Sequence, residues 1–395
     1  MADVVRETFF SIARCANVAT CLDTKLPHPC RAIVETQPEG RFQLPEPWVG
    51  RIDVAPLLFV ASNPSIGDDA HALLSSSDDE LWESHQLAFG GSRRAYILDG
   101  IRTTRPDGTP LKSVHYWASV RARARELFGL RDVRPGSDYA LTEIVHCKST
   151  KETGVAAAFE TCRDAHLDAV LSVAAARVIV AMGRYAWRAL GIAPSDCVRT
   201  LTLGGRERRL IALQHPSSFA SPKTFAKAVT PAAIAALRAA LVVVERATSS
   251  DRVAAIEIVN EYLQRIGVTP DPGEVSGEIA RHLDDGGAAM WLARLGGRIV
   301  GCVEAHRLAS PDAIEIKRLY VRPDGRRLGI ANRLMDAAEA FAERCGVGRV
   351  CLDTRPTMTA ALALYRARGY EPIPPYHDRS PEHLCFAKRV SAAPG

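Results

Sequence analysis

The sequence predicts two α/β domains in a single chain. Its 395 residues exceed the usual size of one domain, and 47% of them are hydrophobic, enough to bury two cores. Both halves alternate short apolar runs with amphipathic segments, the pattern of strands and helices in turn. A Thr-Ser-Ser-Asp cluster at 248–251 separates the halves. We therefore expect one domain over residues 1–247 and a second over residues 248–395.

The first half contains four short apolar runs that are typical of buried strands. They lie at 56–62, 139–147, 176–183 and 208–218, with helical patterns at 114–129 and 158–174 between them. Continuous apolar runs of this length suit strands that are covered on both faces, as in a parallel sheet. The alternation predicts a doubly wound α/β/α domain, which binds ligands beyond the carboxyl ends of its strands.

The second half begins where an alanine-rich helical pattern ends. The predicted elements around and after this point are helices at 230–247 and 251–267, a hairpin at 289–308, strands at 313–321 and 349–355, and a helix from residue 329. Residues 248–251 supply both a linker and the N-cap of the second helix. The second half is therefore predicted to be an α/β domain as well.

The composition argues against a membrane protein. No stretch reaches about 18 uncharged apolar residues, and the N-terminus lacks the apolar core of a secretory signal. We expect a cytoplasmic protein with no membrane partner. The formal net charge of +5 permits an anionic partner such as nucleic acid but does not demand one.

The ten cysteines are unevenly spread. Disulfides do not persist in a reducing compartment, so clustered cysteines there indicate either a metal or simple burial. Two groups stand out: Cys15, Cys21 and Cys30 near the N-terminus, and the pair Cys147 and Cys162. We expect the other five to be small core residues.

The stretch VRPDGRRLGIANRLM, residues 321–335, joins a predicted strand to a predicted helix. The free N–H groups and the dipole at a helix N-terminus favour an anion. Gly329 and Ala331 leave room for a phosphate to approach the backbone. The alternative is a tight strand-to-helix connection without a ligand.

Arg326-x-x-Gly329-x-Ala331 resembles the pyrophosphate-binding signature of the GCN5-related N-acetyltransferases (GNAT). IEIKRLYVRP resembles that family's central strand, and LDTRPTMTAALALYRARGYEPIPPY its last helix and strand, so the resemblance covers about residues 250–390. It implies a GNAT-like α/β domain that binds acetyl-CoA and acetylates an amine. The cofactor-binding residues that it implies are Leu319, Val321, Arg326, Arg327, Leu328, Gly329, Ile330 and Ala331.

Acetyl transfer needs a neutral amine and a proton for the leaving thiolate. Tyr365 occupies the position where many GNAT members hold the tyrosine that faces the leaving sulfur; the alternative is a packed core tyrosine. Glu315 resembles the family's strand glutamate and is the candidate general base, directly or through water; the alternative is a solvated strand residue. Met358 stands where the family often has an asparagine.

Three segments of the first half resemble the uracil-DNA glycosylase superfamily, particularly its iron–sulfur class. They are FVASNPSIGDDAH, the stretch from ALTEIVHC to VIVAMGR, and LQHPSSFAS, and the resemblance covers roughly residues 10–245. It implies that Asn63 positions the attacking water and that His215 hydrogen-bonds an oxygen of the base. Ser217 is a further candidate for substrate binding, and the loop after His215 would wedge the duplex.

The first half departs from that class at two positions. Ser62 stands where the class usually has an acidic residue, and Glu143 where it has the asparagine that recognises uracil. An amide offers one donor and one acceptor, whereas an ionised carboxylate offers acceptors only. Glu143, as an ionised carboxylate, is expected to repel O4 of uracil and to prefer a base edge with two donors, so ordinary uracil is predicted to be a poor substrate if the domain is active.

Cys147 and Cys162 match the spacing of the last two cluster ligands in that class. Two of Cys15, Cys21 and Cys30 would complete four thiolates, which suits a [4Fe–4S] cluster or a structural zinc. The class has C-x-x-C at the first pair, and this chain does not. The alternative is a set of buried thiols.

Three hypotheses follow. The chain is an N-acetyltransferase fused to a DNA glycosylase-like domain that excises a modified base. Alternatively, the first domain is a non-catalytic nucleic-acid-binding or scaffolding module. The third hypothesis is a small-molecule acetyltransferase with an inert first half. The acceptor amine does not follow from the sequence, because acceptor loops vary freely on this fold.

Overall fold

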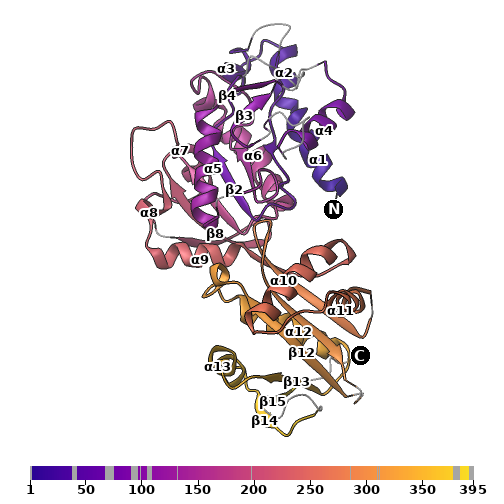
Figure 1. Cartoon of the computed structure of the whole chain (residues 1–395). Helices are drawn as coiled ribbons and strands as arrows, with labels where there is room; N and C mark the ends of the chain where they lie inside the picture. The colour runs from indigo at the N-terminus through magenta and orange to yellow at the C-terminus, as the bar shows by residue number, and fades with distance from the viewer. Residues whose placement is uncertain are drawn as a thin grey trace. The chain divides into compact units, whose positions relative to one another are not determined.

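The computed structural model describes residues 2–37, 42–66, 75–89, 97, 99–104, 109–130, 132–196, 198–284, 286–308, 310, 312–376 and 383–390. The chain divides into two compact units, Met1–Leu241 and Val242–Gly395 (Figure 1). Across these described ranges, no helix has the length and apolar character that crossing a membrane requires.

The first unit is built on a six-stranded sheet. Its strands are β1 (Trp48–Val49), β2 (Leu57–Ala61), β5 (Tyr139–Glu143), β6 (Val178–Met182), β7 (Arg199–Leu203) and β8 (Arg206–Leu213), in the order β1-β5-β2-β6-β8-β7. The four central strands pair in parallel, and the two edge strands are antiparallel to their neighbours. Every residue of β2, β5 and β6 is buried, as the sequence predicts for a doubly wound sheet.

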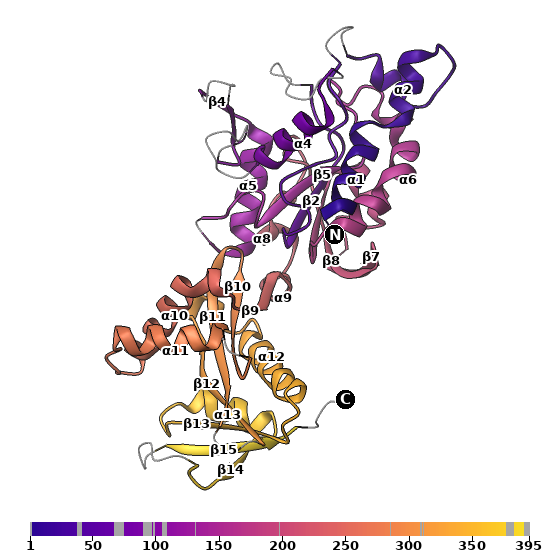
Figure 2. The same cartoon turned by 90° about the vertical axis from the view of Figure 1, so that its right-hand side faces the viewer.

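Helices cover both faces of this sheet; Figure 2 shows α1 and α6 on one side and α5 on the other. The elements outside the sheet are α1 (Ala2–Ala13), α2 (Ala16–Asp23), α3 (Arg31–Val34), α4 (Asp78–Leu87), β3 (Arg102–Thr104), β4 (Pro110–Ser113), α5 (His115–Phe128), α6 (Val155–Val173), α7 (Arg184–Leu190), α8 (Phe225–Ala228) and α9 (Pro231–Leu241). The unit is thus the α/β/α arrangement of the first prediction.

The second unit contains a seven-stranded sheet in the order β14-β15-β13-β12-β11-β10-β9. Its elements are β9 (Val242–Arg246), α10 (Arg252–Arg265), α11 (Pro272–Asp284), β10 (Ala288–Leu295), β11 (Arg298–Arg307), β12 (Ala313–Val321), α12 (Ile330–Arg344), β13 (Arg349–Thr354), α13 (Thr359–Ala367), β14 (Glu371–Ile373) and β15 (Leu384–Arg389). Only the β12–β13 pair is parallel among the pairs of this sheet in the described ranges.

One predicted element is wrong. The sequence pattern predicts a single helix over 230–247, but α9 ends at Leu241 and the next five residues form β9, which pairs with β10. Three consecutive β-branched valines favour the strand once a partner is present. The first unit therefore ends at Leu241, ahead of the predicted boundary at residue 247. After β9, the side chains of Thr248 and Asp251 form a capping box ahead of α10.

The two parallel strands of the second unit part midway. Their register runs from Ala313↔Arg349 to Ile316↔Leu352 and stops there, although β12 continues to Val321 and β13 to Thr354. The register between β11 and β12 also shifts, so that Arg318 and Leu319 together face one residue of β11. Arg318 has φ 50°, which is uncommon for a residue other than glycine. These two irregularities shape the middle of the sheet.

Candidate active sites

The connection from β12 to α12 has the form of an anion site. Gly329 is the N-cap of α12 with φ 73°, and a Cβ placed on it would meet no atom within 4 Å. The space in front of the first helical turn is therefore open, and the side chains of Arg326 and Arg327 are exposed beside it. A helix of fifteen residues presents its N–H groups and positive dipole end there.

The other predicted cofactor residues divide into two kinds. Leu319 and Val321 lie on the part of β12 that is not paired to β13. Leu328 and Ala331 are half-buried at the start of α12. Ile330 is 1% exposed, so it anchors the helix to the core and offers a ligand only its backbone.

Tyr365 lies on α13 against two aromatic rings. Its ring centroid is 5.9 Å from that of Tyr370 and 6.4 Å from that of Phe386. Burial raises the pKa of Tyr365, and Tyr262 and Asp353 raise it further. Within the described ranges its hydroxyl makes no hydrogen bond, so it is a neutral phenol with a proton to donate.

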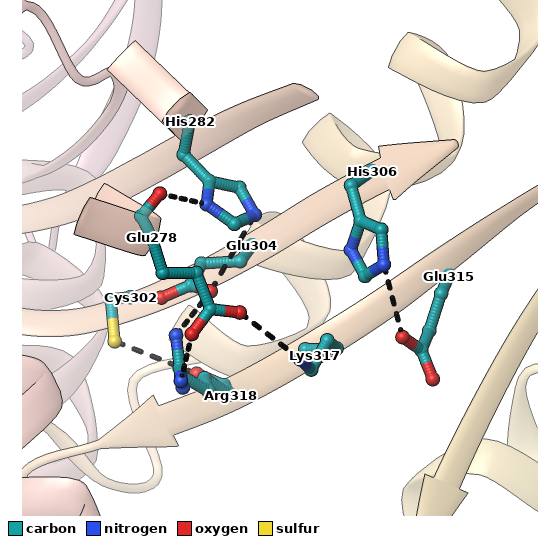
Figure 3. Close-up of polar contacts among 8 residues, drawn as sticks. All are labelled: Glu278, His282, Cys302, Glu304, His306, Glu315, Lys317 and Arg318. Carbon is teal, nitrogen blue, oxygen red and sulfur yellow. Dashed lines mark hydrogen bonds and ion pairs between the residues drawn. The ribbon is translucent and has the colours of Figure 1, made fainter. Parts of the chain in front are cut away.

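Glu315 is held on both of its carboxylate oxygens (Figure 3 shows the His306 contact). Nε2 of His306, directly opposite on β11, lies 3.2 Å from Oε2, and the hydroxyl of Tyr376 donates to Oε1 at 2.8 Å. Burial raises the pKa of Glu315, but the hydrogen bonds from His306 and Tyr376 outweigh it and lower the pKa to about 2. At 1% exposure, Glu315 is an ionised carboxylate with little basicity.

A second buried network, which the sequence analysis missed, surrounds Arg318 (Figure 3). Nη1 of Arg318 lies 2.9 Å from Oε2 of Glu304, and Nη2 pairs with Glu278 of α11. Lys317 adds a pair to Glu278 at 3.1 Å, and Nε2 of His282 lies 3.6 Å from Oε2 of Glu304. The network fixes the left-handed residue that precedes Leu319.

A third pair was also missed. Nδ1 of His383, just before β15, lies 2.5 Å from Oδ2 of Asp353 on β13. The two residues are 30 positions apart in the chain, and no local motif links them. Asp353 follows Leu352, the last residue of β13 that pairs with β12.

In the first unit, Glu143 and Asn63 follow neighbouring strands. Glu143 is the last residue of β5 and is 5% exposed. Burial raises the pKa of Glu143 to about 8, with Glu46 adding and Lys148 opposing, so the carboxyl carries a proton at neutral pH. This corrects the assumption of an ionised Glu143, because a protonated carboxyl offers one donor and one acceptor. Its Oε2 is buried and has no hydrogen-bond partner in the described ranges.

Tyr116 lies between His215 and Glu143 and interacts with both. The rings of Tyr116 and His215 stack with centroids 5.4 Å apart, and Glu143 raises the pKa of Tyr116 after burial. Burial lowers the pKa of His215, which is therefore neutral. The backbone N–H of Ser217 donates to its Nδ1 at 3.2 Å, so the proton is on Nε2, a donor for a carbonyl oxygen.

The remaining glycosylase-like residues are less closely joined. Asn63 donates to Pro64 O at 2.9 Å and to Oγ of Ser149 at 3.0 Å. No contact in the described ranges joins it to Glu143 or His215. The side chain of Ser217 is exposed, and Phe219, in the same loop, is fully exposed. Part of the first motif, residues 67–71, lies outside the described residues.

The five predicted metal-ligand cysteines gather in space. All five are free thiols: Cys15, Cys21, Cys30, Cys147 and Cys162. Burial raises the pKa of Cys147, and the other four thiols raise it further, so all lie near one another. Cys15 Sγ also lies 3.4 Å from Nε2 of His166. Yet no three His, Cys, Asp or Glu side chains of the described ranges are arranged to hold a metal ion.

Family models match both units. A model described as the acetyltransferase (GNAT) family matches residues 255–370, and one for the uracil DNA glycosylase superfamily matches residues 47–238. An uncharacterized N-acetyltransferase of Schizosaccharomyces pombe is 34% identical over 135 residues, which are 33% of this chain and 83% of that protein. N-acetyltransferase 8 of Homo sapiens is 31% identical over 94 residues, 23% of this chain. The chain covers 41% of that relative's length.

Solved structures of acetyltransferases align with part of the chain. An acetyltransferase of the GNAT family from Staphylococcus aureus is 18% identical, with 38% of this chain and 98% of that chain covered and a TM-score of 0.34. The PaiA N-acetyltransferase of Thermoplasma acidophilum in complex with coenzyme A is 17% identical, with 38% and 99% covered and a TM-score of 0.32.

Proposed function

The chain belongs, through its C-terminal unit, to the GNAT family of acetyltransferases, and on that premise we propose that it transfers the acetyl group of acetyl-CoA to an amine. The observation that carries this proposal is the parting of β12 and β13 beside the open N-terminus of α12. In this proposal the pantetheine arm of acetyl-CoA lies between the parted strands. The pyrophosphate of the same cofactor binds at the turn that carries Arg326 and Arg327.

Each predicted residue takes a role in this proposal. The exposed Arg326 and Arg327 neutralise the pyrophosphate, and the first backbone N–H groups of α12 bind it. Leu319 and Val321 offer backbone groups to the pantetheine arm. Tyr365 protonates the leaving sulfur. Glu315, the sequence-based candidate base, stays a candidate, although its low pKa and two occupied oxygens favour a role in holding its neighbours.

The test is direct. Titration calorimetry with acetyl-CoA, followed by measurement of free-thiol release in the presence of a panel of primary amines, checks binding and transfer separately. We expect saturable binding and amine-dependent thiol release. Binding without release for any amine would leave a cofactor-binding protein and contradict the proposed reaction.

A second function, for the first unit, is favoured by Glu143. We propose that this unit binds an extruded nucleobase through Glu143, His215 and a positioning water on Asn63. A protonated Glu143 presents one donor and one acceptor to a base edge that carries C=O beside N–H, and Nε2–H of His215 presents a donor to a second base oxygen. The exposed Phe219 would fill the vacated stack.

Two outcomes of this binding are distinguishable. If the bound base is excised, the unit is a glycosylase; if it is bound and kept, the unit is a module that brings the acetyltransferase to nucleic acid. Incubation with oligonucleotides that contain uracil or hypoxanthine, followed by alkaline cleavage and by filter binding, separates these cases. Absence of both cleavage and binding contradicts this second function.

We also propose that four of the five clustered cysteines of the first unit hold a [4Fe–4S] cluster; the proposal rests on the number and chemistry of the thiols. We propose separately that the protein is cytoplasmic. Four thiolates suit such a cluster, and His146 N–H already donates to Cys162 Sγ at 3.5 Å. The five thiols lie near one another, but no three of them are arranged to hold one metal ion in the described ranges, so binding a cluster requires their side chains to move closer together. The cluster, when bound, would brace the first unit. Iron and sulfide analysis of anaerobically purified protein tests it, with Cys345→Ser, a half-buried cysteine of the other unit, as the control.

A further inference from the structure

Asp353 stands where the two central strands of the second unit part. It is the first residue of β13 after the last β12–β13 pair, and its side chain is 12% exposed. Its carboxylate raises the pKa of Tyr262 and of Tyr365. Because Tyr365 is the proposed proton donor to the leaving sulfur, Asp353 lies beside the position of the thioester.

His383 is oriented by this carboxylate. With Oδ2 of Asp353 accepting a hydrogen bond from Nδ1–H at 2.5 Å, the neutral imidazole has its lone pair on Nε2. The His383 side chain is 22% exposed, and Nε2 makes no hydrogen bond within the described ranges. A carboxylate that fixes the tautomer of a histidine and stabilises the imidazolium is a general device for making a base.

The other carboxylate–histidine pair of this face is less suited to that task. In the Glu315–His306 pair, Nε2 of His306 is occupied by the carboxylate, and Nδ1 is buried without a partner in the described ranges. Neither nitrogen of His306 is therefore open to an incoming amine. Glu315 itself is ionised and bonded on both oxygens.

We infer that His383 is the catalytic base of the acetyl transfer, that it accepts the proton of the attacking amine on Nε2, and that Asp353 is its positioning residue. This inference rests on the proposed function of the second unit. It assigns the acceptor to the face of the sheet that carries both Asp353 and Glu315, near the start of β15.

The acceptor ammonium first gives one proton to Nε2 of His383, which passes it to solvent. The neutral amine nitrogen then forms a bond to the acetyl carbonyl carbon. The carbon–sulfur bond breaks, and its electron pair leaves on sulfur, which takes a proton from the hydroxyl of Tyr365. The second proton of the attacking nitrogen passes through solvent to the phenolate, and both residues return to their starting state. An amine that arrives neutral omits only the first proton transfer, the one that uses His383.

The charged and titratable surroundings of the Asp353–His383 pair come from six elements or their flanks. They are Tyr262 of α10, Glu315 of β12, Arg355 after β13, Tyr365 of α13, Tyr376 after β14 and Cys385 of β15. Lys317 and Arg318 of β12 also lie near this group, but they are paired with Glu278 and Glu304. The carboxylates of Asp353 and Glu315 therefore favour a positively charged group beside them. The acceptor class that fits is a primary amine that arrives protonated and must lose a proton.

The test uses two probe amines with the full-length protein. Ethanolamine is protonated at neutral pH, whereas hydroxylamine is not and needs no base for its deprotonation. We expect His383→Gln to lower kcat/KM for ethanolamine on the order of 100-fold while hydroxylamine is little affected. Asp353→Asn is expected to show the same selective loss for ethanolamine, because the amide no longer fixes the proton of His383 on Nδ1. The dissociation constant for acetyl-CoA reports whether the variants are folded.

His306→Gln is the matched control, since it removes a carboxylate-paired histidine of the same face. It should lower the rates with both amines alike. If His383→Gln also lowers both alike, His383 is structural and the inference is overturned. If Glu315→Gln shows the selective loss for ethanolamine instead, the base is Glu315. If the wild-type protein releases no thiol with any amine, the proposed function itself falls, and the inference with it.

Discussion

Nη1 of Arg318 lies 2.9 Å from Oε2 of Glu304, a carboxylate with no exposed surface on the neighbouring strand. The backbone of Arg318 adopts the left-handed conformation, which costs a residue with a Cβ roughly 1–2 kcal/mol. The buried ion pairs to Glu304 and Glu278 offset this cost. They thereby hold the bulge that sets the course of β12 at Leu319, beside the proposed thioester.

Glu304→Gln should therefore destabilise the second unit. Removing one partner of a buried pair leaves the other charge poorly compensated, which costs about 3 kcal/mol. Urea denaturation followed by fluorescence measures the loss. Glu371→Gln, at an exposed site on β14, is the control and should change nothing. Equal stability of the two variants would show that the ion pair does not hold the bulge.

Acid should weaken the second unit in a defined range. The pKa values of Glu278 and Glu315 are lowered on folding from 4.5 to about 2. Both groups therefore stabilise the fold above their ordinary pKa, and this stabilisation is lost as the pH falls from 4.5 toward 2. Each contributes about 3 kcal/mol by this linkage. Unfolding free energies compared across that range should fall less steeply for Glu315→Gln, which has lost one of the two titrations.

Gly329→Asp should weaken acetyl-CoA binding at least tenfold, about 1.4 kcal/mol, relative to Gly329→Asn. Both side chains tolerate the left-handed conformation, so the comparison isolates the negative charge at the helix N-terminus. Calorimetry gives both affinities. Gly346→Asp, at the far end of α12, also has open space around it and should bind as the wild type does. Equal affinities of the two Gly329 variants would contradict the proposal that the pyrophosphate binds at this turn.

Tyr365→Phe should lower kcat more than it raises KM for acetyl-CoA. The hydroxyl acts only when the thiolate leaves, so its loss raises the barrier of the chemical step without weakening ground-state binding. Steady-state kinetics under conditions where chemistry is rate-limiting measures the effect. An unchanged kcat would show that Tyr365 does not protonate the sulfur and only packs against Tyr370 and Phe386.

Base binding by the first unit should depend on pH through Glu143. The protonated carboxyl is present below its pKa of about 8 and is lost above it, so affinity for a uracil-containing oligonucleotide should fall as the pH rises through 8. Glu143→Asn carries a donor and an acceptor at every pH and should bind independently of pH. Glu46→Gln removes a charge that raises the pKa of Glu143 and should shift the fall to lower pH. A pH-independent wild type would contradict this role.

The sequence predicts an element correctly where the burial of that element determines its own pattern of apolar residues. The apolar runs that became β2, β5 and β6 are buried at every residue, so their composition alone identified them. Val242–Arg246 is predicted as helix because it continues the helical spacing of the alanine-rich segment before it. Its pairing with β10 makes it a strand. Such a choice depends on a partner distant in the chain.

The candidate sites were predicted in part for a similar reason. Gly329 and Tyr365 belong to local motifs, so their neighbourhood could be read from a short stretch. The Asp353–His383 pair joins β13 to the start of β15, and its contact depends on the register of those strands. Glu143 was identified, but its proton was not, because the pKa follows from burial and from Glu46, which a linear motif does not contain.

The parting of β12 from β13 creates two strand edges inside a sheet instead of at its rim. A ligand arm with amide groups can be accepted there as an additional strand would be, so that the ligand completes the sheet. A ligand of this kind stabilises the folded protein, by about 2.7 kcal/mol at a concentration 100 times its Kd. If acetyl-CoA is that ligand, as proposed, the melting temperature of the second unit should rise with the acetyl-CoA concentration, and the ligand-free protein should be the form that unfolds first.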